Sequence, residues 1–409
     1  MKIAIVDHVG NKGGVSRVIR KLLPELAQIE PKNSITYFGS ALSIDREDFF
    51  KDFKKYKINI IKLNSLNFNF DYSEKNFFKK FINVLQRKIF SHVQFLPTFL
   101  TGNLKKELEN KLAGFDLIYF PWPYLIELPN ISKPMVATFH DFNFRYYFSG
   151  IPTYSKNQLT LLNQQMEKWL TKTKIIVSNN FTADELKKFY PNIQKKINII
   201  PLGPYSEKKN LDIETYNRIK KKFNLPNNYI FCGTNTCAHK NLNPMFAAIN
   251  ILKKKNILIN LVLTGPGTEI INGESDEYGV KLVDDNKKDI FGLGYVSNLE
   301  LDMIIENSSA IISPEMYTSD NGPATDGWIR GKPVIISDIP SNREHIENQK
   351  VFAELFNYRS PENIAEKIEK VLKDSNQNYQ NEAKKSMEAM NKIKWQDVAL
   401  KYLEVFNDS

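Results

Sequence analysis

A chain of 409 residues is too long for one ordinary core and fits two domains of about 200 residues each, with room for an insertion. A hydrophobic fraction of 42% with 25% charged residues is typical of a globular protein and excludes the disordered and fibrous classes. The net charge of +10 favours an anionic partner such as a nucleotide, a nucleic acid or a lipid headgroup. No helix-turn-helix, zinc-finger or RNA-sheet signature is present and the charge is spread along the chain, so we expect no nucleic-acid partner.

Cysteine content and hydropathy predict a cytoplasmic protein. Cys232 and Cys237 lie in one strand-to-loop segment, and no further cysteine is present to complete a zinc site or a disulfide framework. The N-terminal MKIAIVDHVG is too short an apolar stretch for a signal peptide, and no later run reaches the roughly 18 apolar residues of a membrane span. We therefore expect free thiols and no integral membrane segment, with peripheral attachment to the inner face of the cell membrane left open.

The first half of the chain alternates short apolar runs with stretches of helical periodicity. Strands are predicted at KIAIVD, FDLIYF, KPMVATFH and KIIVSN. This pattern is typical of a parallel sheet with helices on both faces, and we assign it to an N-terminal domain of residues 1–205. An insertion at about residues 44–112, rich in lysine and phenylalanine, interrupts this domain.

Within the insertion, the segment NFFKKFINVLQRKIF has the pattern of a basic amphipathic helix. Apolar residues recur every four positions with basic residues between them: Phe77, Phe81, Leu85 and Ile89, and Lys79, Lys80, Arg87 and Lys88. Such a helix can lie on an anionic membrane. A core-facing helix has the same pattern, so both interpretations stay open.

The same alternation restarts in the second half, with strands predicted at YIFCG, INLVLTG, DIFGLG, AIISPE and KPVIIS. These runs end in small or polar residues, where a strand of such a sheet meets a ligand crevice. We assign residues 206–390 to a second Rossmann-like domain, joined to the first by a linker near residues 202–212. The C-terminal helix, residues 391–409, has one apolar face and either closes the second domain or crosses back to the first.

Two loops of the first domain carry candidate site residues. Gly10, Gly13 and Gly14 follow the first strand in GNKGGVSRVIRKLL, where backbone amides and a helix amino end can face an anion. The spacing is not GxGxxG, and a bare glycine turn explains the loop equally well. In VATFHDFNF, His140 is placed to position a ligand hydroxyl and Asp141 to cap the next turn, with a histidine satisfied by backbone groups as the alternative.

The first strand of the second domain leads to a candidate phosphate site. In FCGTNTCAHKN, Gly233 and Thr234 end the strand and Lys240 precedes an amphipathic helix. A lysine at this place can compensate the charge of a diphosphate, and Thr234 can add a hydroxyl donor. A solvated lysine before a helix is the alternative.

Two further glycine-bearing loops are predicted at strand ends. Gly265 lies in LTGPGTE, and Tyr295 and Val296 lie in FGLGYVSNLEL ahead of a helix capped by Ser297 or Asn298. Backbone groups of such loops can form hydrogen bonds with a nucleotide base. Each of these signals is weak alone.

The most informative stretch is AIISPEMYTSDNGPATDGWIRGKPVIISDIPSNREHI. After a strand it presents acidic and small residues, then opens a helix near Pro323 and ends it at Gly331. The helix amino end beside Asn321 and Gly322 predicts a diphosphate site, while Asp326 can accept hydrogen bonds from two ribose hydroxyls.

The order of these elements resembles the retaining, nucleotide-sugar-dependent glycosyltransferases of family four, whose fold is GT-B. The resemblance covers nearly the whole chain, weakly at residues 40–115 and well at residues 116–409. It rests on the GG loop, FHD, VSNNFT…INIIPLG, GTNTCAHKN, LTGPG, GLGYVSNLEL and SPEMY…GKPVIISDIPSNREHI, which are specific in their order and spacing. We therefore expect an α/β protein of GT-B fold, in which an acceptor-side and a donor-binding Rossmann-like domain face a central cleft.

The resemblance also implies contacts with a nucleotide-sugar donor. It carries seven positions over: Gly13 and Gly14 near the diphosphate, His140 near the transferred sugar, Thr234 and Lys240 at the phosphates, and Tyr295 and Val296 at the base. Gly233, Gly265, Asn321 and Gly322 complete the expected donor site. We expect His140, Lys240 and Asp326 to act in catalysis, with no metal and no cofactor.

The chain departs from the family pattern at a pair of acids. The family usually has two glutamates eight positions apart, the first contacting donor-sugar hydroxyls and the second the ribose, and here Thr318 and Asp326 stand at these positions. Asp326 keeps a carboxylate, whereas Thr318 cannot accept charge-assisted hydrogen bonds. We expect Glu315 or Asp320 of the same loop to substitute. Thr234 also replaces an arginine that is usual in the family.

The reaction implied by the resemblance is transfer of a hexose or deoxyhexose, with mannose- or rhamnose-like donors guessed, with retention of configuration. The acceptor is expected to be a hydroxyl of a surface polysaccharide, lipopolysaccharide or glycoprotein glycan, lipid-linked where the basic helix meets a membrane. No residue stands out as a covalent nucleophile, which suits a front-face mechanism. The alternatives are a non-catalytic GT-B accessory or glycan-binding subunit, favoured by Thr318, and a nucleotide-sugar epimerase, disfavoured because no second suitably placed acid is evident.

Overall fold

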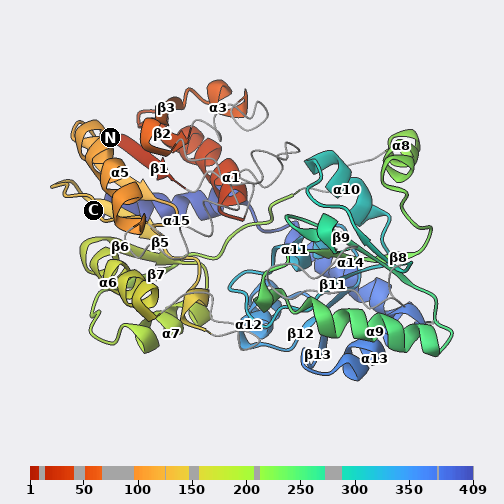
Figure 1. The fold of residues 1–409 in the computed structure, drawn as a ribbon. Coiled ribbons are helices and arrows are strands. Elements are labelled where there is room, and N and C mark those ends of the chain that lie inside the picture. Colours follow the sequence, from red (N-terminus) through yellow and green to blue (C-terminus); the bar gives the residue numbers. More distant parts are fainter. Residues whose placement is uncertain are drawn as a thin grey trace, which may run out of the picture. The chain divides into compact units, whose positions relative to one another are not determined.

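The computed structural model describes residues 1–8, 14–40, 51–66, 96–124, 126–146, 156–206, 212–271, 288–374 and 377–408 (Figure 1). The chain separates into two compact units. The first comprises Met1–Arg145, Tyr154–Gly203 and Trp395–Ser409, and the second comprises Tyr146 and Pro204–Lys394. Each unit is built on one parallel sheet with interleaved helices, which confirms the predicted α/β class with two doubly wound domains.

The sheet of the first unit contains, within the described residues, seven parallel strands in the order β3-β2-β1-β4-β5-β6-β7. They are β1 (Lys2–Asp7), β2 (Ser34–Ser40), β3 (Asn59–Leu63), β4 (Leu117–Phe120), β5 (Met135–Thr138), β6 (Lys174–Val177) and β7 (Ile197–Ile199). The central strands are apolar runs because helices cover both faces of the sheet. The strand order reverses between β1 and β4, so their carboxyl ends flank the point where ligands bind in such sheets.

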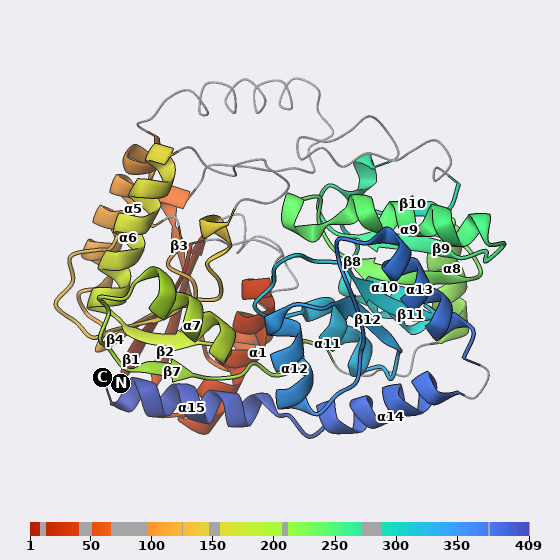
Figure 2. The ribbon, with the colours of Figure 1, turned by 90° about the horizontal axis from the view of Figure 1, so that it is seen from below.

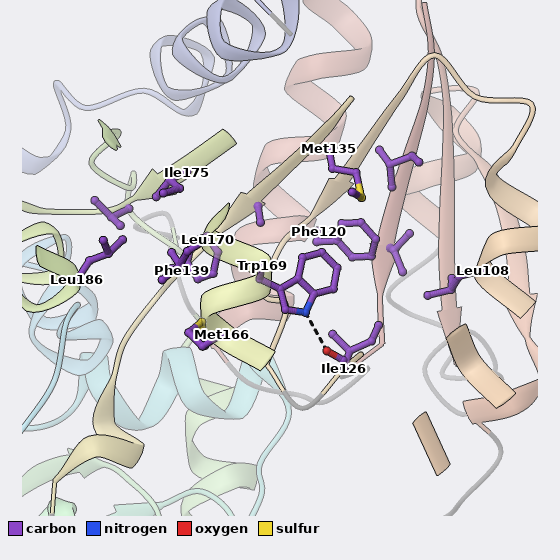
Figure 3. Packing of buried hydrophobic residues seen from close by; sticks show 14 of the residues in the cluster. Leu108, Phe120, Ile126, Met135, Phe139, Met166, Trp169, Leu170, Ile175 and Leu186 are labelled. Carbon is purple, nitrogen blue, oxygen red and sulfur yellow. Dashed lines mark hydrogen bonds between the residues drawn. The ribbon is translucent and has the colours of Figure 1, made fainter. Parts of the chain in front are cut away.

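The helices of the first unit enclose two apolar layers. They are α1 (Gly14–Ile29), α3 (Lys51–Lys55), α5 (Leu96–Leu112), α6 (Lys156–Lys172) and α7 (Asn180–Phe189), with the 3-10 turns η1 (Asn64–Leu66) and η2 (Asn143–Arg145). Figure 3 shows one layer around Trp169 of α6, whose ring meets Phe120 of β4 at a centroid distance of 4.6 Å. The Trp169 Nε1–H donates to the carbonyl of Ile126 at 2.8 Å, so the one polar atom of this ring is satisfied in the core.

The C-terminal helix α15 (Trp395–Asn407) belongs to the first unit, although it follows the entire second sheet in the sequence. It packs beside α1 (Figure 2). The residues of its predicted apolar face are buried, and the Tyr402 ring meets Tyr119 of β4 edge-on at 5.7 Å. The Tyr402 hydroxyl also lies 3.2 Å from the hydroxyl of Thr138. These contacts bury the helix against the face of the sheet that α1 covers.

The sheet of the second unit has, among the described residues, six parallel strands in the order β10-β9-β8-β11-β12-β13. They are β8 (Tyr229–Gly233), β9 (Asn260–Thr264), β10 (Ile290–Gly292), β11 (Ala310–Ser313), β12 (Val334–Ser337) and β13 (Glu354–Phe356). The order reverses between β8 and β11, which makes the carboxyl ends of these two strands the expected place for a ligand.

Helices cover both faces of this second sheet. They are α8 (Ile213–Phe223), α9 (Leu242–Lys254), α10 (Asn298–Glu306), α11 (Gly322–Trp328), α12 (Pro340–Gln349), α13 (Pro361–Leu372) and α14 (Asn378–Met390), with η3 (Ala238–Lys240) and η4 (Thr268–Ile270). Helices α9 and α13 lie side by side and bury one apolar cluster, while α8, α10 and α11 bury the other (Figure 1). Ser297 forms a capping box with Glu300 at the start of α10, which confirms the predicted cap.

Some predictions concern residues outside the described part of the chain. These are the basic amphipathic segment at residues 77–89 and the loop residues Gly10 and Gly13. Among the helices that the structure describes, none has the length and apolar character needed to cross a membrane. Cys232 is buried and Cys237 is half-buried, and both are free thiols as expected.

Candidate functional site

The loops that follow β8, β9 and β10 are hydrogen-bonded to one another at the carboxyl edge of the second sheet. The amide of Thr234 donates to the carbonyl of Thr264 at 2.8 Å, and the amide of Gly265 donates to the carbonyl of Gly294 at 2.8 Å. Gly265 has a φ of +129°, and a Cβ there would lie 1.8 Å from the Thr234 carbonyl oxygen. Only glycine fits this close approach, so the structure brings two of the predicted site residues, Thr234 and Gly265, into contact.

An ion pair joins the two strands at the reversal point. Lys240 ends η3, which follows β8, and Glu315 follows β11. The Lys240 Nζ lies 2.5 Å from Glu315 Oε1, with exposed side-chain fractions of 18% and 2%. The amide of Met316 donates to the carbonyl of His239 at 2.8 Å, which ties the two loops together beside the pair. The predicted phosphate-binding lysine and one of the two candidate substitute acids therefore meet directly.

The two carboxylate oxygens of Glu315 have different surroundings. Oε1 binds Lys240, whereas Oε2 is buried and has no hydrogen-bond partner among the described residues. The Ser337 hydroxyl holds the backbone of this residue by donating to the Glu315 carbonyl at 2.5 Å. A buried acceptor without a donor costs free energy, so Oε2 is the natural contact for a hydrogen-bond donor on a ligand.

Burial sets the protonation of two neighbours of this pair. Together with the adjacent Lys240 charge, which has the smaller effect, burial lowers the pKa of His239 to about 3. Burial also raises the pKa of the Cys232 thiol well above its ordinary value, with the Glu315 charge adding to the effect. His239 and Cys232 are therefore neutral at physiological pH, and Lys240 and Glu315 carry the charge at this point.

The carboxylate of Asp320, the second candidate substitute acid, is engaged by residues outside its own loop. Its Oδ2 accepts from the Tyr205 hydroxyl, and its Oδ1 lies 3.7 Å from Nδ1 of His345. Thr318, at the position where the family has a glutamate, donates its hydroxyl to the Asp320 carbonyl at 3.1 Å. The hydroxyl of Thr318 thus stabilises the loop locally.

The amino end of α11 was predicted to bind a diphosphate beside Asn321 and Gly322. The helix begins at Gly322 and is seven residues long. Its N-cap residue Asn321 is buried and accepts from the amide of Ala324 at 3.1 Å, while its own amide group donates to Asn342 Oδ1 at 3.1 Å. The side chain of Asn321 therefore caps the helix end.

Asp326, the predicted ribose contact, lies in a buried network. Its Oδ1 accepts from the Ser206 hydroxyl at 2.8 Å and lies 3.8 Å from Nη1 of Arg330. The same Nη1 donates to Ser206 Oγ at 2.9 Å, and Nη2 of Arg330 binds Asp302. A ribose hydroxyl would share the Asp326 carboxylate with these partners. No local sequence motif links Ser206, Asp302 and Arg330, so this network could not be predicted from the sequence.

The two residues predicted to face a base differ in exposure. Tyr295 is 47% exposed at the start of the loop before α10. Val296 is buried in the apolar cluster that includes Met303, so its side chain belongs to the core. Binding of a base by its backbone groups stays a prediction.

The first unit carries a second group of polar and aromatic residues at its own carboxyl edge. His140 is half-buried and follows β5, while Gly14 begins α1, where an added Cβ would meet nothing within 4 Å. His8 follows β1, and its Nε2 lies 2.5 Å from the Tyr124 carbonyl oxygen. The rings of Trp122 and Tyr124, in the loop after β4, stack at 4.8 Å with an interplanar angle of 12°.

His8, Trp122 and Tyr124 were not singled out from the sequence. A signal for His8 was available, because it follows a buried strand in the same way as His140. Burial lowers the pKa of His8, against the opposing effect of its contact with the Tyr124 backbone. Among the described residues, no group of three or more His, Cys, Asp or Glu side chains is arranged to hold a metal ion.

Comparisons with known proteins agree with this architecture. Residues 212–388 match the model of the family described as glycosyl transferases group 1. No curated protein matches the chain. Three solved structures match over 100% of both chains: Anabaena HepE in complex with UDP and glucose (TM-score 0.65, 11% identity), sucrose-phosphate synthase from Thermosynechococcus elongatus (0.66, 13%), and WaaG, a glycosyltransferase involved in lipopolysaccharide biosynthesis (0.67, 10%).

The two-domain α/β architecture is the GT-B fold of these structures, and the family match over residues 212–388 supports a glycosyltransferase. The matched residues 212–388 lie in the second unit and include the Lys240–Glu315 pair.

Proposed function

We propose that this enzyme transfers a hexose or deoxyhexose from a nucleotide sugar to a hydroxyl of a glycan, with retention of anomeric configuration. The observation that carries the proposal is the Lys240–Glu315 pair at the reversal point of the second sheet. It places one cation and one carboxylate with an unpartnered oxygen where such a sheet receives its ligand.

In this proposal Lys240 binds the donor diphosphate and stabilises its charge as the sugar leaves. A lysine that is 18% exposed is covered enough for its charge to act strongly and open enough to reach a ligand. His239 beside it is neutral, so Lys240 supplies the positive charge at this point. Thr234 and Gly265 line the adjacent strand ends, and Asp326 holds the ribose in competition with Ser206.

We place the glycan acceptor at the carboxyl edge of the first sheet. His8 and His140 follow two of its strands, and Trp122 and Tyr124 present stacked rings between them in the strand order. Imidazoles and aromatic rings suit an uncharged, hydroxyl-rich sugar. Neutral imidazoles form hydrogen bonds with its hydroxyls, and the rings offer it an apolar face without adding a charge. His140 is then close to the transferred sugar, as the family resemblance implies.

The acceptor class we propose is a surface polysaccharide, lipopolysaccharide or glycoprotein glycan. The named role of WaaG in lipopolysaccharide biosynthesis supports this direction for a chain of the same fold. We further propose that the basic segment at residues 77–89 holds the enzyme on an anionic membrane, where lipid-linked acceptors lie. Sedimentation with anionic liposomes tests this contact: the full chain should bind more than a chain lacking the segment, and equal binding would contradict it.

The proposed reaction is tested by a transfer assay with a panel of donors and oligosaccharide acceptors. UDP-glucose is the first donor to try, because HepE was solved with it, followed by GDP-mannose and dTDP-rhamnose. We expect release of the nucleoside diphosphate that depends on the acceptor, a product with the anomeric configuration of the donor in its NMR spectrum, and full activity in EDTA. Inversion would contradict the retaining mechanism, and loss of activity in EDTA would contradict the metal-free one.

A further inference from the structure

The loop between β11 and α11 contains two carboxylates and a hydroxyl, but they are not equally available to a ligand. Asp320 accepts from Tyr205 and lies near His345, and Thr318 donates to the Asp320 carbonyl. Glu315 is 2% exposed, with one oxygen on Lys240 and the other unpartnered among the described residues. Glu315 is therefore the residue of this loop that is held in place by an ion pair and still has a carboxylate oxygen able to accept a hydrogen bond.

The charges around this oxygen restrict what it can receive. A phosphate oxygen cannot donate a hydrogen bond at neutral pH and would be repelled by the carboxylate. A cationic group would be repelled by Lys240, which already binds Oε1 of Glu315 at 2.5 Å. A neutral hydroxyl donates without adding charge, and hydrogen bonds to a charged acceptor are stronger than neutral ones. Of these three groups, a hydroxyl is the one that can donate to Oε2 of Glu315 without charge repulsion.

A bare nucleoside diphosphate and a nucleotide sugar meet this site differently. Either ligand must compete with Glu315 for Lys240 when its diphosphate arrives. Only the nucleotide sugar brings hydroxyls close to its phosphate, and one of these can occupy Oε2. The Glu315 carboxylate therefore weakens the binding of the nucleoside diphosphate. For the nucleotide sugar, the hydrogen bond from the sugar hydroxyl to Oε2 offsets that loss.

We propose that Glu315 makes the donor site select a nucleotide sugar over the corresponding nucleoside diphosphate, by accepting a hydroxyl of the sugar on Oε2 while Oε1 holds Lys240. This inference rests on the proposed function and assigns the sugar-contacting acid to a position outside the usual glutamate pair. This selectivity of Glu315 also favours release of the nucleoside diphosphate product, because the product no longer carries the hydroxyl that Glu315 bound.

The test compares wild-type protein with Glu315→Gln, which removes the charge and keeps the size of the side chain. Titration calorimetry gives the dissociation constants of UDP and UDP-glucose, and of GDP and GDP-mannose. For the pair that binds, the ratio of the nucleotide constant to the nucleotide-sugar constant should fall about tenfold in Glu315→Gln, because the sugar hydroxyl loses its charged acceptor while the loss of diphosphate repulsion affects both ligands alike.

The matched control is Glu354→Gln. Glu354 is also a buried glutamate of the second unit that pairs with a lysine, with Lys367 at 3.0 Å, but it lies at the amino end of β13. This variant should leave the ratio unchanged. A series of UDP-glucose analogues, each lacking one sugar hydroxyl, provides a second measurement on the unaltered protein: one analogue should lose about tenfold in affinity, and loss of that hydroxyl should have no further effect in Glu315→Gln.

The outcomes separate this inference from the proposed function. An unchanged ratio in folded Glu315→Gln, or an equal loss for both ligands, would mean that Glu315 only positions Lys240 and would overturn the inference. If Glu315→Gln does not fold, an analogue series in which no hydroxyl matters overturns it instead. Wild-type protein that binds none of these four ligands, and none of dTDP, dTDP-rhamnose, CDP and ADP, refutes both proposals. Normal selectivity without transfer to any acceptor refutes the transfer reaction alone.

Discussion

The carboxyl edges of the two sheets have the same topology but different chemistry. Each sheet reverses its strand order once, between β1 and β4 in the first unit and between β8 and β11 in the second. At the first reversal the described residues include imidazoles and stacked aromatic rings. At the second they include an ion pair, Lys240–Glu315, and a loop with further carboxylates.

The difference indicates two ligands of unlike charge. Neutral rings recognise the shape and hydroxyls of an uncharged sugar, whereas a lysine with an adjacent acid recognises a phosphate joined to a sugar. In the proposed function, one architecture would serve an acceptor and a donor through different residues after corresponding strands. Substitutions at the two edges should change different kinetic constants, and the predictions below use this separation.

The largest effect is expected for Lys240→Ala at the charged edge. It removes the cation that we propose binds the diphosphate, and it leaves the Glu315 carboxylate buried without its partner. We expect kcat/KM for the nucleotide sugar to fall by about 100-fold or more, measured by steady-state kinetics with saturating acceptor.

The control for this variant is Lys253→Ala. Lys253 lies in the last turn of α9 and pairs with Asp289 at 2.7 Å, at the amino ends of the strands. It should leave donor kinetics unchanged. Equal losses in both variants would show that any lysine of this basic chain matters equally, and the phosphate role of Lys240 would be wrong.

A smaller effect is expected for Trp122→Ala at the neutral edge. The Trp122 ring stacks on Tyr124, and removing the Trp122 ring removes an apolar surface on which we propose the acceptor sugar packs. The KM for the acceptor should rise about tenfold while the KM for the donor stays the same. Tyr56→Ala, in the turn before β3 at the amino edge, is the control. A rise in donor KM for Trp122→Ala would contradict the assignment of the two edges.

The pH dependence of unfolding tests the neutrality of His239. In the folded enzyme its pKa is about 3, against about 6.5 in an unfolded chain, so the unfolded form binds more protons between these values. The free energy of unfolding must therefore fall as the pH drops below about 6.5. His239→Gln should reduce this fall by about 1 kcal/mol between pH 6.5 and 5.5. Urea unfolding at both pH values measures it, and parallel curves for the two proteins would refute a neutral His239.

The smallest effect is expected for Thr318→Ala. The Thr318 hydroxyl donates to the Asp320 carbonyl 3.1 Å away, and the proposed sugar contact is Glu315. Loss of one loop hydrogen bond should lower kcat/KM by about threefold at most. A loss above tenfold, with unchanged thermal stability, would return the sugar-contacting role to the usual position of the family.

Much of the fold could be predicted because both sheets are covered on both faces. Strands such as β1 and β11 then appear as unbroken apolar runs that end where ligands bind. Gly265 was predictable from its residue type, since its backbone conformation and its contact with Thr234 admit only glycine.

The partners within the site were not predictable in the same way. Lys240 and Glu315 are 75 positions apart, and Ser206 and Asp326 are 120 apart, so their pairing depends on the three-dimensional packing of separate strand ends. The sequence offered Glu315 and Asp320 as equal substitutes for Thr318. The distinction between them comes from hydrogen bonding, which leaves an oxygen of Glu315 unpartnered among the described residues.

The central claim is that Lys240 forms part of a nucleotide site, and thermal unfolding with UDP, GDP, dTDP, CDP and ADP tests it most directly. At about 100 times its dissociation constant, a ligand of the folded state adds about 2.7 kcal/mol to the free energy of unfolding. We expect a rise of several degrees in the Tm of the wild-type enzyme with one of these nucleotides, and no rise in Lys240→Ala. No rise with any nucleotide, or the same rise in both proteins, would contradict it.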